Sequence, residues 1–253
     1  MVNRAECALL AEEFRARFNI DNLSPIDVFF VANQIPLLTT VLYPLSKSIS
    51  GMSVKGEGFM LAAINSGQTY GRQRFTLGHE LYHLFYDEGM QGTVVCPADK
   101  TEQDEIEQQA DAFASYLLLP RLALINEVRN RNLASINNGD ELLQNLLEIE
   151  ARYQVSHACL LLRLMEEGVI DARKAAPLKL NIKKNARRLG FSTRLYEPRN
   201  GYSAKQADGA YVSFVGELLG NETISRGKAK ELLADAFRDD IFITEFDEEA
   251  PYD

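Results

Sequence analysis

Apolar residues recur along the chain with two periods, one typical of helices and one typical of strands. The first stretch, to Phe18, has apolar residues at helical spacing. A second helix is expected from Ser24 as the N-cap and Pro25 in the first turn, and it runs to about Asn33. Short apolar runs bounded by Pro, Gly, Ser and Asn predict strands at 35–43, 49–54 and 58–65.

Helical periodicity dominates from residue 71 onward. One helix is expected from Gly71 to near Gly89, and another from Thr101, its N-cap, to Pro120. From about Gly139 the pattern stays helical through LLQNLLEIEARY and SHACLLLRLMEEG, and shorter helical elements follow. Strands in the first half and helices in the second predict an α+β fold.

Composition limits the class of protein. A chain of 253 residues with 46% hydrophobic residues can bury a substantial core, in one large domain or in a main domain plus a smaller one. It has no run of 18 apolar residues and no continuous apolar segment near its start, so we expect neither a membrane span nor a signal peptide. Three scattered cysteines, Cys7, Cys96 and Cys159, imply no disulfide framework and favour a cytoplasmic location.

Charge is distributed unevenly. The net charge of −9 argues against a nucleic-acid coat protein. Between residues 171 and 201, however, the sequence has nine lysines and arginines and only two acidic residues, Asp171 and Glu197. We favour a solvated, mobile connector for this basic segment. The alternative is a docking surface for an acidic partner, or a weak contact with phosphate.

The strongest chemical signal is HELYH, residues 79–83. On a helix, His79 and His83 lie one turn apart on the same face, so both imidazoles can reach one metal ion. Glu80 is rotated to one side and can serve as a general base for water at the ion. The alternative is two ordinary histidines on a buried helix. A chance match to this motif arises in about one sequence in a hundred of this length.

A third ligand is expected from the acid-rich stretch that follows. The metzincin extension is absent, because Tyr86 and Gly89 stand where it needs glycine and histidine. Among the acids of TEQDEIEQQAD, Glu107 borders the apolar stripe and has Asp111 four residues later. A glutamate ligand with an aspartate one turn on would also supply an acceptor for a ligand histidine. Two histidines, one glutamate and an open position are typical of a catalytic zinc site.

Three further features carry weaker signals. His157 is expected to be a packing or surface residue rather than a ligand. Cys96 lies in the loop expected between the two metal-site helices and could bind or occlude zinc as a thiolate, although a surface or half-buried free cysteine is favoured. Residues 146–168 suggest helix, turn, helix, but the second helix offers leucines around a single Arg163, so we do not expect it to read DNA.

RFTLGHELYHL followed by EQQADAFASYLLLP resembles the ImmA/IrrE family of metallo-endopeptidases. The family signature joins HExxH to a downstream E-x-x-A-[ND]-x-F-A-x-x-L-L-x-P, and the resemblance covers roughly residues 3 to 170. Gly78 and Tyr82 depart from the residues common there, and neither is a ligand position. The resemblance implies a gluzincin-like minimal zincin domain, with His79, His83 and Glu107 binding Zn²⁺ and Glu80 as the catalytic base.

The resemblance also implies a substrate, a helix-turn-helix (Xre-type) repressor whose cleavage relieves transcriptional repression. We divide the chain into a metallopeptidase domain, a helix-turn-helix-like extension and a C-terminal region, at 1–125, 126–170 and 171–253. The sheet edge at 58–65 is expected to bind an extended substrate peptide. The alternative function is a catalytically silent binding module that regulates transcription by protein contact. Neither hypothesis includes a further cofactor, and direct binding to nucleic acid or to a membrane is not expected.

Overall fold

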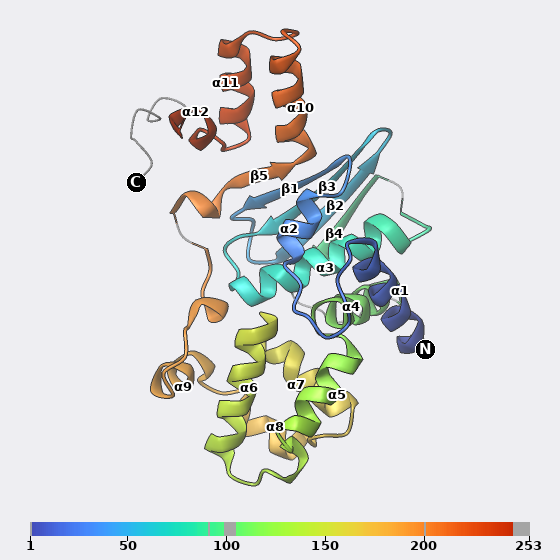
Figure 1. Ribbon diagram of the computed structural model, residues 1–253, viewed down its shortest axis with the longest axis vertical. Coiled ribbons are helices and arrows are strands. Elements are labelled where there is room, and N and C mark those ends of the chain that lie inside the picture. Colours follow the sequence, from blue (N-terminus) through green and yellow to red (C-terminus); the bar gives the residue numbers. More distant parts are fainter. Residues whose placement is uncertain (1, 91, 99–104, 200, 245–253) are drawn as a thin grey trace.

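A five-stranded mixed sheet lies at the centre of the chain, with the strand order β4-β2-β3-β1-β5. The computed structural model describes residues 2–90, 92–98, 105–199 and 201–244 (Figure 1). The strands are β1 Leu38–Tyr43, β2 Ile49–Gly56, β3 Phe59–Asn65, β4 Gly92–Pro97 and β5 Gln206–Gly209. β1 and β3 are parallel, and the other neighbouring pairs are antiparallel.

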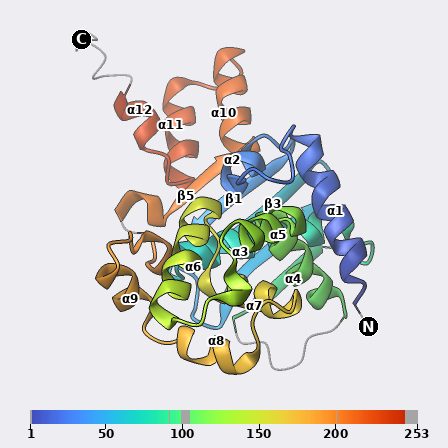
Figure 2. The same cartoon turned by 60° about the horizontal axis from the view of Figure 1, so that its bottom comes forward.

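Helices surround this sheet and make up most of the remaining chain, so the predicted α+β class is confirmed. The α-helices are α1 Arg4–Arg17, α2 Val28–Asn33, α3 Tyr70–Tyr86, α4 Glu105–Leu118, α5 Arg121–Asn130, α6 Gly139–Tyr153, α7 His157–Glu166, α8 Ala172–Leu178, α9 Ile182–Arg188, α10 Ala210–Gly220, α11 Arg226–Asp235 and α12 Asp240–Thr244. Short 3₁₀ helices lie between these elements: η1 Leu133–Ser135 lies between α5 and α6, and η2 Arg194–Tyr196 and η3 Gly201–Ala204 lie between α9 and β5. Figure 2 turns the end that carries α5 to α8 toward the reader, opposite α10 and α11.

Three expectations about local structure need correction. The N-cap of α2 is Asp27 rather than Ser24, because the Asp27 carboxylate accepts hydrogen bonds from the first turn of the helix. Residues 92–97, expected as a loop, form the edge strand β4. The 58–65 strand is not an edge, because β3 lies between β2 and β1 and pairs with both. The predicted cap Thr101 lies outside the described residues.

The helix α3 carries the HELYH motif and lies between the sheet and α4. It buries Leu77, Leu81 and Leu84 completely and packs against β2, β3 and α4. Gly78 permits the close approach to α4, because a Cβ at this position would lie 3.2 Å from the Ala114 Cβ. The sequence pattern thus brings the two predicted metal-site helices into direct contact.

The second helix of the helix-turn-helix-like element, α7, is committed to packing. Leu160, Leu161 and Leu164 are buried. The fully buried Arg163 guanidinium lies 3.9 Å from the centre of the Tyr116 ring and donates to two carbonyls at the end of α4, Ser115 O at 3.2 Å and Leu119 O at 2.8 Å. This helix therefore does not present its polar side chain to DNA.

The basic segment folds into α8, α9 and η2 and makes several internal contacts. Lys183 and Arg187 pair with Glu197, and Arg188 pairs with Asp140. The backbone of Glu197 also accepts a hydrogen bond from the Tyr70 amide at the start of α3. The segment is thus a structured part of the fold, and the expectation of a simple connector was wrong.

The C-terminal region adds the fifth strand to the sheet. β5 pairs with β1, and at its end Gly209 has a φ of +87° and lies so close to Leu38 that a Cβ would come within 2.4 Å of the Leu38 carbonyl oxygen. Beyond it, α10 to α12 pack on a small apolar cluster of their own. The main apolar cluster runs from Cys7 to Ala186, and the predicted domain boundaries stay predictions.

Within the described part of the chain, no helix is both long and apolar enough to cross a membrane.

His157 is a buried packing residue, as one of the two predicted alternatives had it. Its Nδ1 lies 2.6 Å from Glu150 Oε1, and its Nε2 lies 2.9 Å from the carbonyl oxygen of Leu178. The Tyr196 hydroxyl donates to the other Glu150 oxygen at 2.5 Å. Burial opposes the charged form of His157, but the bonds to Glu150 and Leu178 outweigh it and raise its pKa.

We expect Arg163→Met to lower the free energy of unfolding by about 1–3 kcal/mol, because the buried Leu119 carbonyl loses its donor, while the Ser115 carbonyl keeps only the Leu119 amide. Urea unfolding measures this change. The control is Arg173→Met, whose side chain is 96% exposed and which should shift stability by less than about 0.5 kcal/mol. Equal effects of the two substitutions would contradict the role assigned to Arg163.

Stability should also depend on pH through His157. Because its pKa is raised on folding, the stabilisation is fully present below the unfolded value of about 6.5 and is lost as pH rises through the folded value. The difference in unfolding free energy between wild type and His157→Gln should therefore shrink as the pH rises above about 6.5. A difference that stays constant or grows over this range would argue against a charged His157.

Candidate metal centre

The two histidines of α3 converge on one point. His79 and His83 are both 1% exposed, and their Nε2 atoms lie 3.2 Å apart. Their ring centres are 4.9 Å apart and the ring planes meet at 62°. The i, i+4 spacing therefore directs the two imidazoles to the same space, as the motif predicts.

Glu107, in the first turn of α4, faces both histidines. Its Oε2 lies 3.3 Å from His79 Nε2, and its Oε1 lies 3.2 Å from His83 Nε2. Hydrogen bonds from both histidines hold the pKa of Glu107 well below its usual range. Of the other acids considered from the sequence, Glu105 is exposed and Glu102 lies outside the described residues.

Each histidine has a carboxylate at its other ring nitrogen. His79 Nδ1 lies 2.8 Å from Asp111 Oδ1, and His83 Nδ1 lies 3.0 Å from Asp87 Oδ2. An ionised carboxylate only accepts, so each Nδ1 donates, and a bound metal ion would take the place of the proton that each Nε2 shares with Glu107. Asp111 was predicted in this position, whereas Asp87 was missed. The signal for Asp87 was available, because it follows His83 by four residues, just as Asp111 follows Glu107.

The charge balance favours a cation between these groups. Burial opposes protonation of His79, but contacts with Asp111, Cys96 and Glu107 outweigh it and raise its pKa well above the usual value. Burial likewise opposes protonation of His83, and its contacts with Glu107 and Asp87 raise its pKa. The carboxylates thus stabilise positive charge at the point where the two Nε2 atoms meet.

The spacing of the donor atoms fits zinc. Two ligand atoms about 2.0–2.1 Å from a tetrahedral zinc lie roughly 3.3 Å apart. The three separations among His79 Nε2, His83 Nε2 and the Glu107 oxygens are 3.2, 3.2 and 3.3 Å. Two imidazoles and one carboxylate are also the donor set of many catalytic zinc sites. These residues could hold the ion without rearrangement.

Glu80 lies beside this centre on the face toward the sheet. It is fully buried, and among the residues that the structure describes neither of its carboxylate oxygens has a hydrogen-bond partner. A Cβ at Gly51 on β2 would lie 2.8 Å from Glu80 Oε1, so this glycine makes room for the carboxylate. Burial raises the pKa of Glu80. A buried carboxylate without a hydrogen-bond partner lowers the stability of the fold. Its presence therefore indicates a chemical role.

Cys96 lies at the same centre. The thiol is on β4 and is 1% exposed, so the expectation of a surface or half-buried cysteine was wrong. Donor atoms of Cys96, His79 and Glu107 all lie within 4.8 Å of one another. The sequence placed Cys96 in a loop because β4 carries no strong strand pattern, and only the pairing of β4 with β2 brings the thiol to α3.

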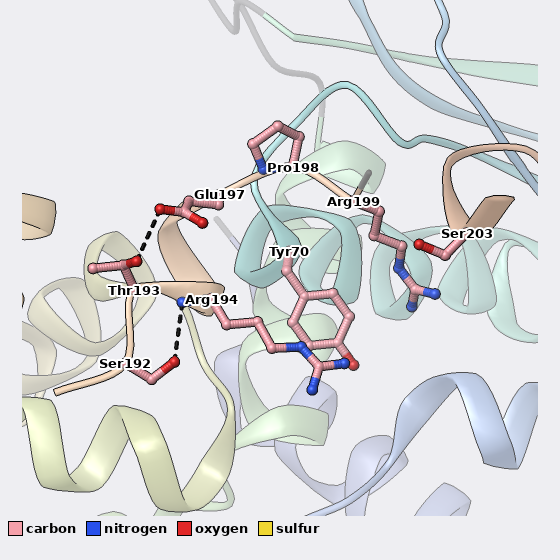
Figure 3. A pocket seen from close by; sticks show the side chains of 8 residues that line it. All are labelled: Tyr70, Ser192, Thr193, Arg194, Glu197, Pro198, Arg199 and Ser203. Carbon is pink, nitrogen blue, oxygen red and sulfur yellow. Dashed lines mark hydrogen bonds between the residues drawn. The ribbon is translucent and has the colours of Figure 1, made fainter. Parts of the chain in front are cut away.

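A separate cavity of about 390 Å³ lies at the N-terminal end of α3 (Figure 3). Among its lining residues, Arg194 and Arg199 lie over the ring of Tyr70, with their guanidinium carbons 5.2 Å and 5.0 Å from its centre. The cavity is lined by Tyr70, Ser192, Thr193, Arg194, Glu197, Pro198, Arg199 and Ser203. None of these is a residue of the metal centre, so the cavity is not its substrate pocket.

Comparison with known families gives one match. The family model described as the IrrE N-terminal-like domain, Peptidase_M78, matches residues 45–165. The matched range runs from just before β2 to the end of α7 and includes α3, β4 and α4, which carry the centre. No curated protein matches the chain.

Replacing the acceptor of either histidine should weaken metal binding. We expect Asp111→Asn and Asp87→Asn each to lower zinc affinity by about ten- to a hundred-fold, because the Nδ1 proton loses its charged acceptor. Chelator competition measures the affinity. Asp235→Asn, an exposed aspartate of α11, serves as the control and should leave it unchanged. Unchanged affinity in Asp111→Asn would reduce this residue to a helix-surface acid.

Proposed function

Residues 45–165 belong to the IrrE N-terminal-like family of metallopeptidases, Peptidase_M78, and from this premise we propose that the chain is a zinc-dependent endopeptidase. The observation that carries the proposal is the convergence of two imidazole nitrogens and one carboxylate at zinc spacing beside an orphaned buried carboxylate. A binding module has no need for that carboxylate, and an ordinary core would not leave it without a partner.

Each residue of the centre has a separate task in this proposal. His79, His83 and Glu107 hold the ion, and Asp111 and Asp87 fix the orientation of the two imidazoles. A bound zinc would supply Lewis acidity to the scissile carbonyl and to the attacking water at neutral pH. Glu80 accepts the proton of the attacking water and delivers it to the leaving amine. The raised pKa of Glu80 suits a group that must both take and return a proton.

The edge strand β4 is the proposed platform for the substrate. It pairs with β2 on one side only, and it carries Cys96 beside the centre. An extended peptide can add to such an edge through backbone hydrogen bonds, which places a peptide bond near the ion. This replaces the earlier expectation for β3, which has strands on both sides.

The proposed substrate is a helix-turn-helix repressor, cleaved in an exposed linker so that it releases its DNA. This part of the proposal is supported by the resemblance of the two-part signature rather than by a contact in this chain. Selectivity requires contacts beyond the cleaved segment, and the projecting helices α10 to α12 and the basic segment are the surfaces available for them (Figure 1). The chain itself is not proposed to bind DNA, since Arg163 is buried.

The metal and base roles predict distinct phenotypes. His79→Ala, His83→Ala and Glu107→Ala should lose bound zinc, measured by elemental analysis. Glu80→Gln should keep one zinc per chain and lose about a hundred- to ten-thousand-fold in peptide hydrolysis, because only the base is removed. Glu105→Ala, on the exposed face of the same turn as Glu107, is the control and should keep both zinc and activity. Full zinc occupancy in Glu107→Ala would overturn the ligand assignment.

The substrate is tested with a helix-turn-helix (Xre-type) repressor. The purified repressor is mixed with wild type and with Glu80→Gln, each with and without zinc. Cleavage only by zinc-loaded wild type would support the endopeptidase. Release of DNA by an uncut repressor, equally with Glu80→Gln, would favour the binding module instead.

A further inference from the structure

The thiol of Cys96 faces the metal centre because of its register in the sheet. Cys96 on β4 lies directly opposite Gly51 on β2, and opposed residues of an antiparallel pair point to the same face. That face is toward α3, since a Cβ at Gly51 would contact Thr76 and Glu80. The neighbouring Val95 is 46% exposed, as expected for the other face.

An irregularity in the pairing lies next to this residue. The register between β2 and β4 shifts between Ile49 and Gly51, opposite Pro97 and Cys96. The extra residue, Ser50, is buried, and its hydroxyl accepts hydrogen bonds from Gln68, just before α3, and from Arg72 in the first turn of α3. Bulges of this kind redirect neighbouring side chains and occur near functional sites. The direction of the Cys96 side chain is thus fixed by two strands and α3.

The chemistry and the distances both suit a metal ligand. Thiolate is a strong zinc ligand, with a zinc–sulfur distance of about 2.3 Å. Sulfur and nitrogen bound to one tetrahedral zinc lie roughly 3.6 Å apart. The donor atoms of Cys96, His79 and Glu107 lie within 4.8 Å of one another, a set that does not include His83, so the thiolate would have to move by about 1 Å or more to join the three other ligands. The orphaned, buried carboxylate of Glu80 also lies beside this space.

We propose that Cys96 is a fourth protein ligand that closes the metal centre and keeps the peptidase latent. The proposal rests on the zinc site proposed above. On coordination the thiol releases its proton to solvent and the thiolate occupies the position that a catalytic site leaves open. Four protein ligands are typical of closed zinc sites, whereas catalytic sites keep one position for water and substrate.

Release of the latent state requires loss of the Cys96 ligand. Cys96 lies on the same edge strand that we propose as the substrate platform, so a peptide that adds to β4 can displace the thiolate as it binds. An alkylating agent can do the same irreversibly, because the sulfur forms a bond to carbon, the halide leaves and the thioether is a poor zinc ligand. The centre is then left with His79, His83 and Glu107.

X-ray absorption at the zinc edge tests the ligand directly in the full chain loaded with one zinc. Wild type should show one sulfur neighbour at about 2.3 Å together with nitrogen and oxygen neighbours at about 2.0–2.2 Å. Cys96→Ser should lose the sulfur, and Cys7→Ser, a buried cysteine on α1, should retain it. By chelator competition, Cys96→Ser should bind zinc about ten-fold or more weakly.

Latency is tested with the same proteins on an unstructured peptide. Cys96→Ala should hydrolyse it about ten-fold or more faster than wild type, since removing the thiolate lowers affinity but opens the position. A wild-type spectrum with only nitrogen and oxygen neighbours would overturn the proposal even if Cys96 variants do not fold. An equal rate for Cys96→Ala would overturn the latency. A wild-type protein that binds no zinc would instead overturn the proposed function itself.

Discussion

The close contact of α3 with α4 is the constraint on which the rest of the structure depends. Gly78 and Ala114 meet where any larger pair would push the helices apart, and the donor atoms of His79 and Glu107 face each other across the same interface. The far end of α4 is fixed by cations, because Arg15 donates to the Leu117 carbonyl at 2.7 Å and Arg163 to those of Ser115 and Leu119. Positive charge at a helix C-terminus is favourable, and here it also sets the position of the helix that carries Glu107.

The interior of this interface has an unusual charge balance for a protein core. Glu80, Asp87, Glu107 and Asp111 surround two buried histidines whose pKa values are raised. The raised pKa values mean that these carboxylates favour protons on the two histidines when no metal is bound. A divalent cation replaces those protons, so that metal binding is coupled to proton release and weakens as pH falls. The fold therefore positions the ligand atoms before a cation binds.

Local patterns predicted the elements that depend on neighbours in sequence. The helices α3, α4, α6 and α7 and the strands β1 to β3 follow from apolar spacing, and the pairing of Glu107 with Asp111 follows from one helical turn. The edge position of β4, the burial of Cys96 and the order of the strands could not be predicted, because they depend on which distant segments pair. The apolar pattern of β3 would be the same in the middle of a sheet and at its edge, so it does not distinguish the two positions. Asp87 is different, since its spacing from His83 was visible and was not used.

The pairing of β5 with β1 has a consequence for how the chain is made. Thr39, on β1, accepts a hydrogen bond from the amide of Tyr211, a residue 172 positions later. At about 5–20 residues per second, a ribosome needs roughly ten to thirty seconds to reach the second partner after the first. Throughout that time one side of β1 has open backbone donors and acceptors, which can pair with other strands. Translation speed and chaperones that bind extended segments therefore bear on the yield of this protein, independently of the stability of the finished fold.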